Sequence, residues 1–219
     1  MAYSYQNATV EQLNDWELSG DLQRLFNESL EYIDAGNYTF PEGTSNDQKK
    51  EYFVARFLSA ASGDMIGVGD HQYKSIACFD DEKLIGIHCG FYDPSDTSWS
   101  MCVALIGLNK SNTRSYIYEK DYTIGFNNHC KSLGATKLHI YCEEGSQVAF
   151  RFASLVSYGD LSDCYEEEIA ESIIKDIHYY YEIPAYQSIP TPDGLTTNVP
   201  AEVLMDFTTQ SQRFTLTYK

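Results

Sequence analysis

The chain has 219 residues, with 15 Lys and Arg against 32 Asp and Glu, so its formal charge is −17. This length suits one domain, or one domain with an extension, and is long enough to bury a sizeable core. The acidic balance argues against direct nucleic-acid binding, because no basic run exceeds Lys49-Lys50 and a phosphate backbone would be repelled.

The cysteines and the N-terminal residues indicate the cellular compartment of the protein. The six cysteines form no CxxC pair, so the sequence predicts neither a zinc site nor a disulfide framework. The N-terminal stretch MAYSYQNAT has no basic region followed by an apolar one, and no apolar run approaches the roughly 20 residues of a membrane span. We therefore expect a protein of the reducing cytoplasm without a membrane span.

The first third of the chain reads as one edge strand and three helices. Residues 2–8 suit a strand. Thr9 and Gln12 have the spacing of a capping box, which predicts a short helix that ends at Gly20. An amphipathic stripe predicts a second helix over 21–34, and a third is expected over 46–62.

Three strand-like segments follow, at 73–79, 84–92 and 99–108, separated by short polar turns. Short connections of this kind predict adjacent antiparallel strands, a β-meander.

A helix, a strand and a helix are expected next, at 112–133, 137–142 and 145–157, with Gly134 as the stop of the first helix. A strand–helix–strand crossover implies parallel pairing, so we expect a mixed sheet.

The last quarter of the chain has weaker patterns. Residues 163–183 suit either a helix or a strand, and we expect a helix first and a strand last. Four of the six prolines lie in 184–206, which predicts a long irregular arm before a final strand at 213–219. This divides the chain into a domain over 1–183 and a Pro-rich arm over 184–219.

The order of these elements, together with the segment SQVAFRFASLVSY, resembles GNAT-type acyltransferases over about residues 2–183. In that segment Ala149, Phe150, Arg151 and Phe152 fit the family's Ala-Ile-x-Phe-Tyr helix core, and Tyr158 fits its terminal Phe. The resemblance implies an α/β fold with a mixed central sheet, in which an antiparallel meander is followed by a parallel strand and helices flank both. It also implies acetyl-CoA as cofactor.

The cofactor loop departs from the family pattern. In the family a glycine-rich turn before the long helix holds the CoA pyrophosphate on backbone N–H groups. Here the loop at 109–115 has no glycine, although Lys110 and Arg114 could supply positive charge. The resemblance would assign Leu105 and Gly107, in the preceding strand, to the pantetheine arm.

The residues at the positions of the family's acid and base also differ from the family pattern. Ala153 stands where the family has a tyrosine acid, and the strand 99–108 has no carboxylate base. Glu143 and Glu144 are either a substitute base or a solvated turn. His88 suits a core position, and His129, His139 and His178 show no metal-ligand spacing, so no metal is expected.

Two functions are compatible with these observations. The first is a non-catalytic structural or interaction protein without a cofactor, a component of a bacteriophage particle or another assembly. It would contact protein partners through the C-terminal arm and a surface rich in the 18 tyrosines. The alternative is a divergent acetyl-CoA-dependent N-acyltransferase acting on a cationic amine. A cleft between strands 99–108 and 137–142 would favour the alternative.

Overall fold

The computed structural model describes residues 3–33, 40, 43–63, 70–109, 114–116, 119–143, 170–174, 189–190, 196–197 and 211–218. The helix predicted at 145–157 and most of the C-terminal arm lie outside these residues.

Three helices form the N-terminal part: α1 (Val10–Ser19), α2 (Asp21–Tyr32) and α3 (Asn46–Ser62). The capping box is confirmed, since the Thr9 hydroxyl accepts from the Gln12 N–H at 3.2 Å and the Gln12 side chain accepts from the Thr9 N–H at 3.0 Å. Local signals of this kind fix helix starts from sequence alone.

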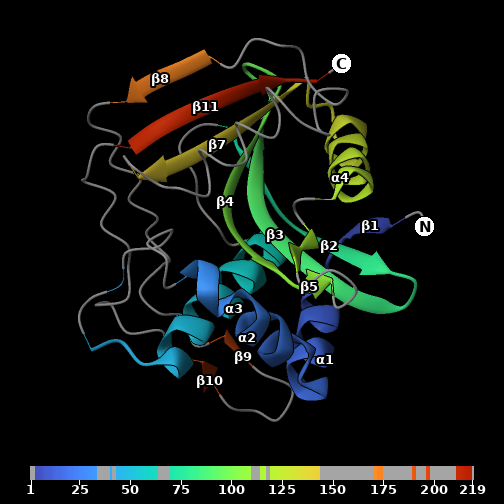
Figure 1. The fold of residues 1–219 in the computed structure, drawn as a ribbon, viewed down its shortest axis with the longest axis vertical. Helices are drawn as coiled ribbons and strands as arrows, with labels where there is room; N and C mark the ends of the chain where they lie inside the picture. Colours follow the sequence, from blue (N-terminus) through green and yellow to red (C-terminus); the bar gives the residue numbers. More distant parts are fainter. Residues whose placement is uncertain are drawn as a thin grey trace.

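Seven strands form one sheet in the order β1-β2-β3-β4-β7-β11-β8. They are β1 (Ser4–Asn7), β2 (Gln72–Asp80), β3 (Lys83–Asp93), β4 (Ser98–Ile106), β7 (Lys137–Glu143), β8 (Ala170–Ile174) and β11 (Ser211–Thr217). Strand β4 pairs with β7 in parallel, and the other neighbours within this sheet are antiparallel. The predicted mixed α/β sheet, a meander followed by a parallel strand, is confirmed (Figure 1).

The predicted helix 112–133 is wrong at its start. A two-strand hairpin, β5 (Leu108–Asn109) with β6 (Arg114–Ser115), comes first, and α4 runs from Lys120 to Ser132. Arg114 and Ser115 are extended because they pair with Asn109 and Leu108 of β5. Glu119 is itself extended, with φ −93° and ψ 128°, and α4 starts directly after it.

The C-terminal part also differs from expectation. Residues 170–174 form strand β8 rather than a helix, because their Ile-rich segment pairs with β11. Strand β11 lies between β7 and β8, so the last strand belongs to the same sheet as the strands before residue 183. The short strands β9 (Ile189–Pro190) and β10 (Thr196–Thr197) pair with each other. The boundary proposed at 183 itself stays a prediction.

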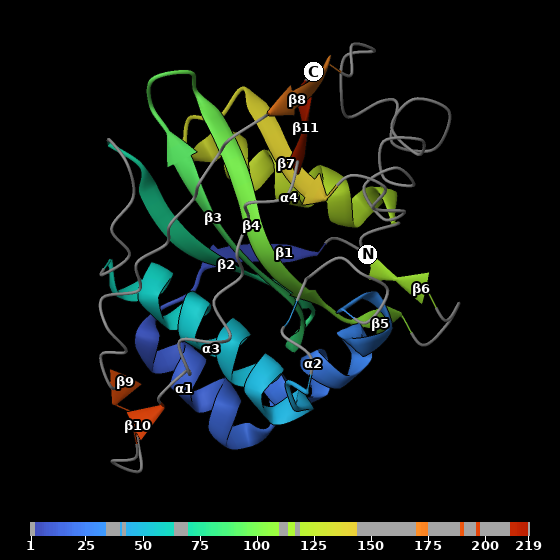
Figure 2. The same cartoon turned by 90° about the vertical axis from the view of Figure 1, so that its left-hand side faces the viewer.

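Helices cover both faces of the sheet (Figure 2). One core lies under α1, α2 and α3 and includes Leu22, Phe53, Phe57, Ile87 and Leu105. The other lies under α4 and includes Ile85, Trp99, Tyr122, Phe126 and Leu138. Within the described ranges, no helix is long and apolar enough to cross a membrane.

Candidate active site

Strand β4 contains a bulge at Cys102. Its partner β3 pairs Gly90 with Met101 but Cys89 with Val103, so Cys102 is an extra residue on β4. A bulge bends the strand and increases its local twist.

The bulge also exchanges the two faces of β4. Before it, Trp99 belongs to the core under α4. After it, Val103 and Leu105 belong to the core under α1, α2 and α3. Residues of odd number therefore face opposite sides of the sheet before and after Cys102.

Strands β4 and β7 separate at this bulge. In the described part of the chain, their pairing ends at Met101 with Ile140, although β4 continues to Ile106 and β7 to Glu143. Figure 1 shows the ribbons of β4 and β7 diverging. We call the two strand edges beyond Met101 and Ile140 the seam.

Helix α2 closes the far end of the seam. The Ser29 hydroxyl accepts from the Ile106 N–H at 3.1 Å, and it lies 3.2 Å from the Ile106 carbonyl and 2.8 Å from that of Leu25, to either of which it can donate. Ser29 is buried. The backbone of Ile106 is thus already hydrogen-bonded by a side chain of α2.

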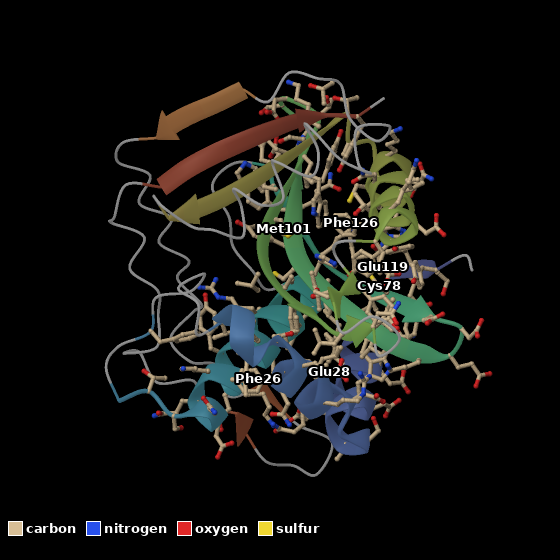
Figure 3. All side chains as sticks on the ribbon, viewed as in Figure 1. Phe26, Glu28, Cys78, Met101, Glu119 and Phe126 are labelled. Atoms are coloured by element: carbon tan, nitrogen blue, oxygen red, sulfur yellow. The ribbon has the colours of Figure 1, made fainter. Side chains whose placement is uncertain are left out.

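Glu28, the residue before Ser29, makes a second contact between α2 and the end of β4 (Figure 3). Glu28 accepts from the Leu108 N–H at 3.0 Å, and Arg24 lies 3.4 Å from both Glu28 oxygens. A Cβ added to Gly107 would come within 2.5 Å of the Glu28 Oε2 atom. A side chain at position 107 would therefore press on the Glu28 carboxylate that accepts from the Leu108 N–H.

The two β4 residues that the resemblance assigned to the cofactor are engaged in the fold. Leu105 is fully buried and pairs with Ile87. Gly107 donates its N–H to the Ile85 carbonyl at 2.8 Å and accepts from the Tyr116 N–H at 3.1 Å. Their role in cofactor binding stays a prediction.

The other predicted site residues lie at the margin of the described ranges. Arg114 is part of β6, opposite Asn109, and Glu143 is the last residue of β7. Lys110 and Glu144 lie outside the described residues. The roles predicted for these four residues are not tested by the structure.

The start of α4 is acidic. The Glu119 carboxylate accepts from the Tyr3 hydroxyl and the Asn109 amide, and it does not cap the helix (Figure 3). Burial, followed by the charge of the nearby Asp80, raises the pKa of Tyr116 to about 12. An anion at this helix start would need the basic residues of the hairpin to offset these carboxylates.

A buried polar trio lies between the sheet and α4. His88 Nε2 is 2.6 Å from the Tyr122 hydroxyl, which also hydrogen-bonds to the Cys78 side chain. Burial lowers the pKa of His88 to about 3, so the ring is neutral at ordinary pH. All three residues are buried, which fits a structural role.

Two histidine–carboxylate pairs occur at the end of the sheet where the β3–β4 turn lies. His71 Nε2 is 3.3 Å from Asp93, and His139 Nε2 is 3.6 Å from Asp96. Sequence reasoning missed both, because the partners come from different elements and only the strand register brings them together. No group of three or more potential metal ligands occurs among the described residues.

No family model matches the chain, and no curated protein matches its sequence. Solved structures do match in fold. One is an acetyltransferase of Salmonella typhimurium that modifies the N-terminal serine of ribosomal protein L7/L12, with TM-score 0.54, 8% identity, and coverage of 100% of this chain and 96% of that one. The chain has the GNAT acetyltransferase fold.

Two further structures with this fold carry bound cofactor. Mycobacterium smegmatis RimJ, in complex with a CoA disulfide, matches with TM-score 0.52 and 8% identity over 98% of this chain and 81% of that one. AAC(6')-Ib, in complex with paromomycin and acetyl-CoA, matches with TM-score 0.50 and 9% identity over 99% and 94%. At these identities the likeness establishes the fold.

These findings correct the predicted function. The expectation of a non-catalytic structural protein is wrong, because the structures that share the fold include acetyltransferases of ribosomal protein L7/L12. The expectation of no cofactor finds no support, since two of the structures hold CoA or acetyl-CoA. A place in a bacteriophage particle finds no support among them. The comparisons favour the catalytic alternative.

Proposed function

We propose that this protein is an acetyl-CoA-dependent N-acyltransferase whose acceptor is a cationic amine. The observation that carries the proposal is the seam, where β4 and β7 separate at the Cys102 bulge within a GNAT fold. Parallel neighbours that stop pairing in mid-strand leave backbone edges between them, and an extended amide-containing chain can add to such an edge.

Part of the β4 edge in the seam is available to the pantetheine arm of acetyl-CoA. The β4 edge next to the bulge would hold the arm, and Lys110 and Arg114 would bind the phosphates. At Ile106 the edge is occupied by Ser29. The arm would therefore pair with β4 close to Cys102, or Ser29 would turn away first. Bound acetyl-CoA supplies the acetyl group as a thioester.

The charge of the chain indicates the acceptor. At −17 the protein attracts ammonium groups over its surface and repels acidic ones. An ammonium nitrogen has no lone pair for attack, so a base must first remove one proton. The sequence prediction gives this role to Glu143 or Glu144 at the end of β7.

The test is a thiol-release assay with acetyl-CoA and a panel of amines at moderate salt. The panel contains a polyamine, an aminoglycoside, and two peptides of equal length, one basic and one acidic. We expect thiol release that depends on the amine, is fastest with the cationic acceptors and slows as salt is raised. A folded protein that releases thiol no faster with any amine than without it would disprove the proposal.

A further inference from the structure

His139 lies next to the point where the seam opens. It pairs with Ser100 on β4, one residue before the last β4–β7 pair, and Ser100 in turn pairs with Phe91 on β3. Residues opposite one another in neighbouring strands share a face. Phe91 belongs to the core under α1, α2 and α3, so His139 faces that side.

The ring is buried while its acidic partner reaches solvent. The His139 side chain is 6% exposed, and the Asp96 side chain is 38% exposed. Asp96 Oδ2 lies 3.6 Å from His139 Nε2, and Asp96 Oδ1 accepts from the Ser98 N–H at 3.0 Å. The carboxylate is thus held by the β4 backbone with its second oxygen toward the ring.

We propose that His139 is the base of the acyl transfer and that Asp96 positions the ring and conducts its proton to solvent. This rests on the proposed function. The amine N–H bond breaks and its proton goes to the imidazole. The nitrogen lone pair forms the new C–N bond as the thioester C–S bond breaks, and a second N–H proton passes through water to the leaving sulfur, which gives the neutral amide and the free thiol. The imidazole proton then leaves along Asp96, which restores the neutral ring.

His139 and Glu143, the base predicted from the sequence, lie far apart along β7. Glu143 lies four residues further along β7, about 13 Å away at the rise of a strand. The two residues therefore cannot serve one reacting nitrogen. His139 is level with the residues at which the seam begins, whereas Glu143 is at the far end of its strand.

The kinetic test compares His139→Gln with Glu143→Gln across pH. We expect His139→Gln to lower kcat by about 100-fold and to leave the KM for acetyl-CoA within about twofold. Asp96→Asn should move the acidic limb of the kcat/KM profile to lower pH, because an opposite charge favours the protonated ring. An active His139→Gln together with an inactive Glu143→Gln would overturn the inference.

A second readout needs no substrate. NMR titration of the His139 ring in the free protein should give a lower apparent pKa in Asp96→Asn than in the wild type, because the carboxylate favours the protonated ring. His129→Gln is the control, since it should not change the His139 titration. An unchanged His139 titration in Asp96→Asn would refute the coupling. Absence of amine-dependent thiol release in the wild type would instead refute the proposed function, and the base role with it.

Discussion

At the scale of single residues, His88 makes folding sensitive to acid. Its ring is buried and neutral, with a pKa of about 3 in the folded chain against 6.5 in an unfolded one. Between these values the unfolded chain binds more protons than the folded one, so stability falls as pH falls from about 6.5 toward about 3.

Urea unfolding measures this effect. From about pH 7 to about pH 5, the His88 contribution should lower the free energy of unfolding by about 2 kcal/mol. Other groups titrate too, so the comparison is with His88→Gln, which lacks this ring and should lose that much less over the same interval. Equal losses in the two proteins would show that His88 is not buried as a neutral ring.

Ser29 is the residue that ties α2 to the end of β4. Ser29→Ala removes the acceptor for the Ile106 N–H and a donor for its carbonyl, both in a buried setting. We expect a loss of about 1–3 kcal/mol in the free energy of unfolding. Ser132→Ala is the control, because the Ser132 hydroxyl is exposed and donates to the backbone carbonyl of His129 in its own helix. If both variants lose the same amount of stability, the Ser29 hydroxyl does not tie α2 to the end of β4.

Whether a contact between two residues could be predicted depends on how far apart they lie in the sequence. The capping box of Thr9 and Gln12 could be predicted, because its two partners are three residues apart. The bond from Ser29 to Ile106 spans 77 residues and joins a helix to a strand edge. No local pattern encodes it, so the sequence indicated the two elements but not their contact.

At the scale of elements, α4 packs closely on β1. A Cβ on Gly125 would clash with the Tyr5 ring at Cε2, and the Tyr5 hydroxyl donates to the Tyr122 carbonyl in the same helix. Glycine at this position in the middle of a helix therefore permits close contact between helix and strand.

Gly125→Ala tests this packing. Helix propensity alone would stabilise α4 by about 1 kcal/mol, but we expect a net loss of about 1–3 kcal/mol because the methyl group forces Tyr5 aside. Chemical denaturation gives the value. Asn128→Ala, at an exposed position of α4, should keep or slightly raise stability. A stabilised Gly125→Ala would mean that β1 and α4 are not in contact here.

The bulge explains why part of the site could not be read from sequence. The segment WSMCVALIGL is apolar or small throughout, so its alternation does not reveal the extra residue at Cys102. The face of each residue beyond Met101, and the separation from β7, follow from that one insertion. The start of α4 was missed for a related reason, since β5 and β6 are too short to leave a periodic signal.

At the scale of the whole molecule, strand neighbours joined by short connections or by one crossover were predictable, and neighbours far apart in sequence were not. The meander and the crossover to β7 follow from loop lengths. The insertion of β11 between β7 and β8 depends on pairing across long sequence separations. The fold was therefore accessible from sequence, whereas the seam and the pair of His139 with Asp96 required the strand register.

Isothermal titration of the purified chain with acetyl-CoA tests the central claim most directly. The account predicts a dissociation constant in the micromolar range. It predicts that Arg114→Ala weakens binding by about tenfold, which corresponds to about 1.4 kcal/mol. Lys137→Ala is the control. It removes a cation at the start of β7, away from the edge where β7 separates from β4, and should leave the dissociation constant for acetyl-CoA unchanged. A folded protein that gives no heat of binding up to millimolar acetyl-CoA would contradict the account.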